Sequence, residues 1–261
     1  MNDVAASKEN HAKLFDNATW IPLLFLRPKR TIHEVVQRTK PVWQLPLLVL
    51  SGLILVLALV SAPIKKMAIE MGTNLPPDFQ YYSPEMQAQF LEAQASQTSP
   101  LFLYVFPILF GILGIWVTWF ITASILHLVI TLYGSRASNT KSYNLTAWAM
   151  LPIALRLILQ IIAVIATKQQ VSAPGLSGFM TADTQGLTAY LRAILAFIDL
   201  YLIFQLILMF LGIKPLSGLS GWKGISAVLI TNLIVLLLKG LPGLLSSVFS
   251  GLSLTGSIFY F

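Results

Sequence analysis

Residues 42–62 read VWQLPLLVLSGLILVLALVSA, an uncharged and strongly apolar block. About 20 apolar residues suffice for a helix to cross the hydrocarbon core of a bilayer. Four more apolar blocks follow along the 261-residue chain. The sequence therefore predicts five membrane-spanning helices, at about residues 42–62, 103–132, 146–167, 189–212 and 225–248.

The composition supports the same fold class. Hydrophobic residues make up 56% of the chain and charged residues only 10%, whereas a soluble domain has roughly 25% charged residues. The predicted fold is an all-α, polytopic helical bundle whose first partner is the lipid bilayer. The net charge of +7 rests on few residues, too few for a nucleic-acid-binding surface. The absence of cysteine excludes disulfides, thiolate metal sites and cysteine nucleophiles.

The positions of Lys and Arg predict the orientation. Most of them lie in residues 1–41 and in the short loops after the second and fourth predicted spans. Basic loops stay in the cytoplasm, so we expect a cytoplasmic basic segment at 1–41, a transmembrane domain at 42–261 and an outer C-terminus. In the outer loop 63–100, Ser83-Pro84-Glu85 predicts a short helix at about 84–95. Residues 240–261 either extend the fifth helix or form a re-entrant segment.

The segment before the first span has its own pattern. Ile32, Val35 and Val36 are spaced i, i+3, i+4 among basic residues, which is typical of a helix lying on a membrane surface. A solvated linker is the alternative. If the segment is a membrane-surface helix, five basic residues would contact the membrane surface: Arg27, Lys29, Arg30, Arg38 and Lys40.

Two charges fall inside predicted spans. Arg156 lies near the middle of the third span and Asp199 near the middle of the fourth. Because each charge costs about 2.5–3.5 kcal/mol at the bilayer centre, we predict that they pair. The pair would fix the register of two helices or belong to a substrate or ion pathway, and the absence of any contact is the third alternative.

His127 is a third ionisable group inside a span, with Ser124 and Thr131 one turn to either side. The three predict a polar stripe that hydrogen-bonds a neighbouring helix, with a proton relay as the alternative. A metal site at His127 is not expected, because the other two histidines lie in the polar N-terminal segment. Hydrolase, zinc-protease and phosphate-loop motifs are absent, so we expect neither an enzyme nor a cofactor.

Several short motifs, in this order and spacing, resemble the Yip (Ypt/Rab-interacting protein) family of membrane proteins, in particular its bacterial branch. They are Arg27-Pro28 with Thr31-Ile32, Gly134-Ser135 after the second helix, Leu151-Pro152 at the third, Ile198-Asp199-Leu200-Tyr201 in the fourth, and Leu216 to Lys223 before the fifth. The resemblance implies five helices, a cytoplasmic N-terminus and a location in the bacterial inner membrane. Eukaryotic relatives bind Rab-type GTPases through a longer cytosolic region, so the short segment here argues against GTPase binding.

The function predicted from these features is that of a non-enzymatic membrane protein that binds or organises other membrane components. It would act as a scaffold or regulator, for example of a transporter complex, and contact other membrane proteins or a second copy of itself. The alternative is a transporter or channel component whose pathway uses His127, Arg156 and Asp199.

Overall fold

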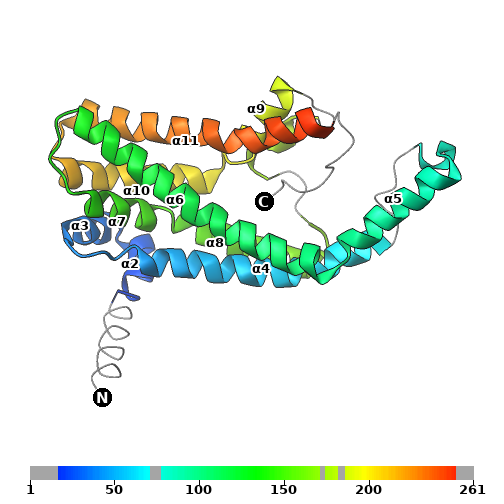
Figure 1. Ribbon diagram of the computed structural model, residues 1–261. Coiled ribbons are helices and arrows are strands. Elements are labelled where there is room, and N and C mark those ends of the chain that lie inside the picture. Colours follow the sequence, from blue (N-terminus) through cyan, green and yellow to red (C-terminus); the bar gives the residue numbers. More distant parts are fainter. Residues whose placement is uncertain (1–16, 71–77, 171–173, 182–185, 251–261) are drawn as a thin grey trace, which may run out of the picture. The chain divides into compact units, whose positions relative to one another are not determined.

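The computed structural model describes residues 17–70, 78–170, 174–181 and 186–250 (Figure 1). These residues are predominantly helical and contain no strand. The elements, in chain order, are α2 (Trp20–Leu26), α3 (Pro28–Gln37), α4 (Gln44–Glu70), η1 (Phe79–Tyr81), α5 (Pro84–Gln97), η2 (Leu101–Val105), α6 (Phe106–Leu132), α7 (Asn139–Ala149), α8 (Pro152–Thr167), η3 (Gly175–Phe179), α9 (Leu187–Leu195), α10 (Leu200–Ser217) and α11 (Gly221–Ser250).

Five segments of the described chain are long and apolar enough to cross a membrane. They are Gln44–Glu70, Leu101–Leu132, Asn139–Thr167, Leu200–Ser217 and Gly221–Ser247. The predicted all-α, polytopic membrane fold is therefore confirmed. Their bounds differ from the predicted ones, most of all in the fourth segment.

The chain divides into two compact units. The first contains the described residues of 1–50, 115–155 and 173–260, and the second contains those of 51–114 and 156–172. Helices α4, α6 and α8 each contribute to both units.

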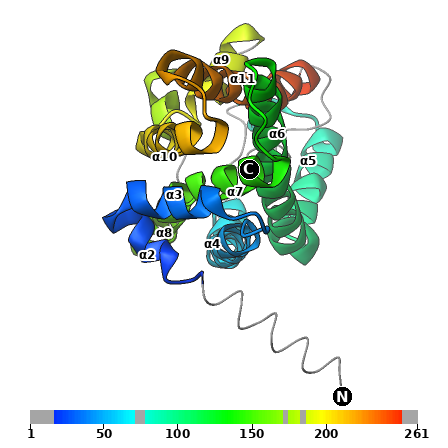
Figure 2. The same ribbon diagram turned by 90° about the vertical axis from the view of Figure 1, so that its left-hand side faces the viewer.

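In the first unit, α3 packs against α7 and α10 (Figure 2). The apolar residues Ile32, Val35 and Val36 are fully buried in this contact. At its centre is Gly212 of α10, where an added Cβ would lie 2.9 Å from Ile32 and clash with Leu145. The glycine therefore permits the close approach of three helices.

This packing changes the interpretation of the amphipathic pattern. The helix predicted around Ile32, Val35 and Val36 is present, but its apolar face is covered by the protein itself and is not available to lipid. The reason is that periodicity identifies an apolar face without showing what covers it.

The fourth segment departs from the continuous helix expected at 189–212. Helix α9 ends at Leu195 and α10 begins at Leu200. Helix α9 lies beside the C-terminal half of α11 (Figure 1), and the Tyr190 hydroxyl donates to the Leu237 carbonyl at 2.9 Å. A Cβ on Gly240 would come within 2.7 Å of Tyr190 and of Ile194, so this glycine lets the two helices meet.

The fifth segment is one helix as far as the structure describes it. Helix α11 runs through Gly240 to Ser250, so this part of the C-terminal region extends the fifth helix. Residues 251–261 lie outside the described residues.

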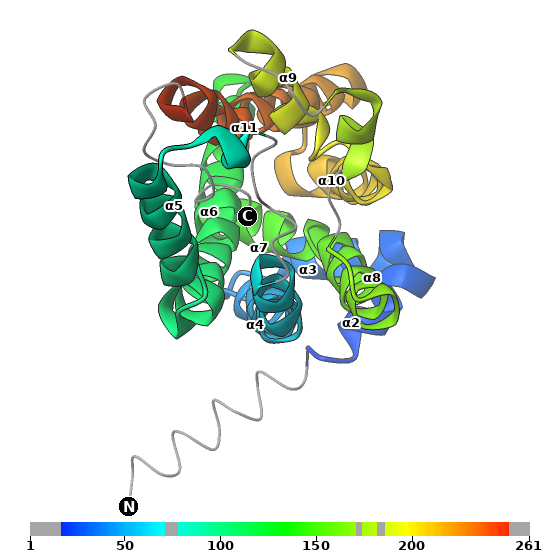
Figure 3. The same cartoon turned by 90° about the vertical axis from the view of Figure 1, so that its right-hand side faces the viewer.

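The second unit includes the loop segment between α4 and α6 (Figure 3). Helix α5 begins as the sequence predicts, with the Ser83 hydroxyl accepting a hydrogen bond from the Met86 N–H at 3.3 Å. The Gln87 amide donates to the Phe79 and Tyr82 carbonyls, at 3.2 and 3.1 Å. These bonds join α5 to η1.

Candidate functional site

The connection between α3 and α4 is held by two side chains of α7. The Asn144 Oδ1 accepts from the Val42 N–H at 2.9 Å, and the Asn144 Nδ2 donates to the Lys40 carbonyl at 3.0 Å. The Trp148 Nε1 donates to the Val42 carbonyl, also at 3.0 Å. Both side chains are fully buried. We call this set of three hydrogen bonds the Asn144 clasp; it fixes the chain just before the first span.

Tryptophan rings surround the clasp. Trp43 packs against Trp119 with ring centroids 4.5 Å apart, and the Trp119 Nε1 donates to the Tyr143 carbonyl at 3.0 Å. Trp20 of α2 contacts Trp148 at 5.5 Å. The guanidinium of Arg38 lies 5.2 Å from the centre of the Trp20 ring, a cation–π distance. The N-terminal segment is thus attached to the first unit by rings as well as by hydrogen bonds.

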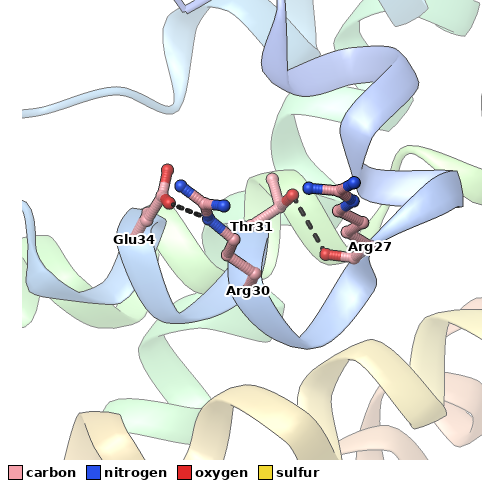
Figure 4. A network of polar contacts seen from close by, with 4 residues as sticks. All are labelled: Arg27, Arg30, Thr31 and Glu34. Atoms are coloured by element: carbon pink, nitrogen blue, oxygen red, sulfur yellow. Dashed lines mark hydrogen bonds and ion pairs between the residues drawn. The ribbon is translucent and has the colours of Figure 1, made fainter.

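The five basic residues of this segment are exposed, in contrast to the buried apolar face of α3: Arg27, Lys29, Arg30, Arg38 and Lys40. We call them the basic face. Figure 4 shows two local contacts on α3: the Arg30 Nε lies 2.9 Å from Glu34 Oε1, and the Thr31 hydroxyl donates to the Arg27 carbonyl at 3.2 Å. An exposed pair of this kind contributes about 0–1 kcal/mol, so it leaves Arg30 able to exchange partners.

Two members of the predicted polar stripe reach α7. The Ser124 hydroxyl lies 2.9 Å from the Tyr143 hydroxyl, and the Ser142 hydroxyl lies 3.4 Å from the His127 Nδ1. Thr131 instead donates to the backbone carbonyl of His127 in its own helix, at 2.7 Å. Within the described ranges, no group of three or more His, Cys, Asp or Glu residues is placed to hold a metal ion.

Asp199 is the N-cap of α10 and does not lie inside a helix. Its carboxylate accepts a hydrogen bond from the Leu202 N–H at 2.9 Å. A carboxylate in this position satisfies a free N–H and is favoured by the helix dipole. Arg156 is a half-buried residue of α8 in the second unit, whereas Asp199 belongs to the first. Their pairing stays a prediction.

A second charge lies near the interruption between α9 and α10. The Lys239 Nζ of α11 is 4.7 Å from the centre of the Phe197 ring. Lys239 therefore faces the connection between α9 and α10, and its charged end contacts protein there.

The motif residues that carry the family resemblance lie where helices begin and end. Arg27 separates α2 from α3, Pro28 is the first residue of α3, and Pro152 is the first residue of α8. Gly134 follows α6 with a φ of +93°, and the N–H groups of Gly134 and Ser135 donate to the Thr131 and Ile130 carbonyls. These two bonds form a Schellman motif, which favours glycine at its left-handed position.

The Asn144 clasp is not among the contacts that the sequence predicts. A signal was present, because Asn144 and Trp148 are hydrogen-bonding residues on one face of the helix that opens the third segment. Their partners are backbone groups, however, and backbone groups leave no trace in side-chain patterns.

Comparison with protein-family models matches residues 23–241 to the Yip1 domain. Comparisons with curated proteins and with solved structures gave no match. The matched range covers most of the chain, from α2 into α11, and includes all five apolar segments except the last residues of the fifth. The chain therefore belongs to the Yip1 domain family and is a multi-pass membrane protein.

Proposed function

We propose that the protein is a non-enzymatic scaffold or regulator located in the bacterial inner membrane. It binds other membrane proteins through its basic face. The observation that carries the proposal is the Asn144 clasp. It fixes the N-terminal segment to α7 by three hydrogen bonds, while the basic side chains of the segment remain exposed.

A fixed cationic surface suits binding to an acidic partner. Because α3 is already packed, its backbone loses little conformational entropy when a partner binds. Complementary charges then accelerate association and select the partner. Acidic cytoplasmic surfaces of membrane proteins, such as transporter subunits, have the required chemistry.

The state of the intramembrane polar groups also supports a scaffold. The hydroxyl of Ser124 and the ring of His127 contact α7, and the carboxylate of Asp199 caps α10. The contacts of Ser124 and His127 hold α6 against α7, and the Asp199 carboxylate is used within its own helix. A transport pathway would need polar groups that exchange partners during each cycle.

Site-specific photo-crosslinking in native membranes tests the proposal. A photoreactive residue replaces Lys29 on the basic face, and a control replaces Tyr81, which is exposed in the second unit. We expect Lys29 to give a defined product with another membrane protein, which mass spectrometry identifies and an Arg30→Glu, Arg38→Glu double variant abolishes. Equal labelling at Lys29 and Tyr81 would count against the proposal.

One observation favours a second function, that of a transporter or channel component. The fourth segment is interrupted between α9 and α10, and discontinuous helices often form substrate and ion sites in transporters. In this case Arg156 and Asp199 would form a functional pair. Proteoliposomes test it: solute flux that Asp199→Asn abolishes, and that an Arg156→Asp, Asp199→Arg exchange restores, would replace the scaffold proposal.

A further inference from the structure

Helix α2 has an apolar side that the other described residues of the chain leave uncovered. Its sequence is WIPLLFL, with no polar side chain except the indole N–H of Trp20. Trp20 and Leu24 are buried against the protein, whereas Leu23 is 37% exposed and Leu26 is 76% exposed. Pro22 is exposed on the same helix.

Both ends of α2 contact segments that can cross a membrane. Trp20 packs against Trp148 of the segment Asn139–Thr167. Phe25 packs against Phe204 of α10, with ring centroids 5.7 Å apart. Phe204 lies thirteen residues before the end of α10 at Ser217, a distance of about 20 Å along the helix axis. Helix α2 therefore lies beside the apolar part of α10 and not at its C-terminal end.

The residues of α10 near this contact have the same character. Ile203 and Ile207 are 52% and 47% exposed, and in an apolar segment of this length such residues face hydrocarbon. The Phe25–Phe204 contact thus places α2 beside a stretch of α10 that carries lipid-facing residues. Arg27 follows Leu26 directly and is exposed, so its guanidinium can extend to the phosphate level in the way that interfacial arginines do.

We propose that α2 is inserted into one leaflet of the bilayer. Leu23 and Leu26 contact the acyl chains of phospholipids, and Arg27 binds their anionic phosphates. This lipid-binding surface replaces the face of Ile32, Val35 and Val36, which the protein covers. It does not depend on the proposed binding of a partner, since Arg27 is the one residue that it shares with the basic face, and Leu23 and Leu26 lie outside that face.

Because the chain contains no cysteine, single cysteines can report the surroundings of each position. Leu23→Cys and Leu26→Cys variants are labelled with an environment-sensitive fluorophore and reconstituted into vesicles of phosphatidylcholine and phosphatidylglycerol. Ile203→Cys is the reference for a lipid-facing position, and Lys29→Cys is the control on the basic face. A lipid with a nitroxide on its acyl chain and aqueous iodide on both sides of the membrane serve as quenchers.

We expect the nitroxide lipid to quench the probe at Leu23 and Leu26 to within about twofold of the quenching at Ile203, because an inserted helix buries its apolar face at the acyl-chain boundary. Iodide should quench only the probe at Lys29. Iodide quenching at Leu26 would overturn the proposal by placing α2 in water. Protection of Leu26 from both quenchers, or efficient disulfide-linked dimerisation of the unlabelled Leu26→Cys variant, would overturn it by showing that protein covers this side.

Discussion

Replacing Asn144 by alanine should weaken the attachment of the N-terminal segment to α7. The change removes the bonds to the Val42 N–H and the Lys40 carbonyl. One hydrogen bond contributes about 0.5–1.5 kcal/mol net, so the pair amounts to about 1–3 kcal/mol. The two orphaned backbone groups belong to half-buried and exposed residues. Water can therefore reach them in part, and the loss should not exceed this range.

The same helix provides a matched control. Thr146 is as deeply buried as Asn144, but among the described residues its hydroxyl has no hydrogen-bond partner. A Thr146→Val substitution removes that hydroxyl while nearly keeping the shape. Because burying an unpaired polar group is unfavourable, we expect Thr146→Val to be neutral or stabilising. The two variants should therefore shift the free energy of unfolding by clearly different amounts.

Two measurements separate the outcomes. Unfolding in mixed micelles with increasing dodecyl sulfate, followed by tryptophan fluorescence, gives the free energy of unfolding. Trypsin cleavage after Arg38 reports release of the segment while the rest stays folded. We expect Asn144→Ala to be less stable and to be cleaved faster than both wild type and Thr146→Val. Equal stability and equal cleavage of the two variants would refute the clasp.

Two further predictions concern helix contacts. Gly240→Ala places a methyl group 2.7 Å from Tyr190 and Ile194, and this overpacking should lower the free energy of unfolding by about 1–3 kcal/mol. Gly114→Ala is the control, because an added Cβ there meets nothing within 4 Å. It should be neutral or slightly stabilising in the same unfolding assay. Tyr143→Phe removes the hydroxyl contact with Ser124 and should lower the free energy of unfolding by about 0.6–1.7 kcal/mol. If Trp119 keeps its place, the wavelength of tryptophan emission should not change.

Hydropathy predicts most of the fold because the bilayer sets the length of a span. Each of the five apolar blocks of the sequence overlaps a segment that is long and apolar enough to cross, and the short helix after Ser83 begins at its predicted proline. Helix α3 also follows its amphipathic pattern. What covers each face does not follow from the sequence, because lipid and protein interior are equally apolar. Leu26 and Ile32 therefore look alike in sequence, although one is exposed and the other buried.

The candidate site was predicted less completely. The polar stripe on α6 follows from residue spacing, and two of its members contact α7. The clasp was missed because Asn144 binds backbone groups about a hundred residues away. The break before Asp199 was also missed, because Ala196, Phe197 and Ile198 are apolar and give no sign of a helix end.

The N-cap position of Asp199 changes the energetic case for its pairing with Arg156. A carboxylate inside a helix at the bilayer centre costs about 2.5–3.5 kcal/mol. At a helix N-terminus, capping contributes about 0.5–2 kcal/mol and the helix dipole about 0.3–1 kcal/mol, so part of that cost is offset. Capping therefore predicts that Asp199→Ala lowers the free energy of unfolding and that Asp199→Asn, which can still cap α10, lowers it less; Arg156→Leu, measured beside them, tests whether the predicted pair adds to the cap. If Arg156→Leu is as destabilising as Asp199→Ala, and exchanging the two charges restores stability, then the pair holds the helices together. In that case capping alone does not explain the contribution of Asp199 to the free energy of unfolding.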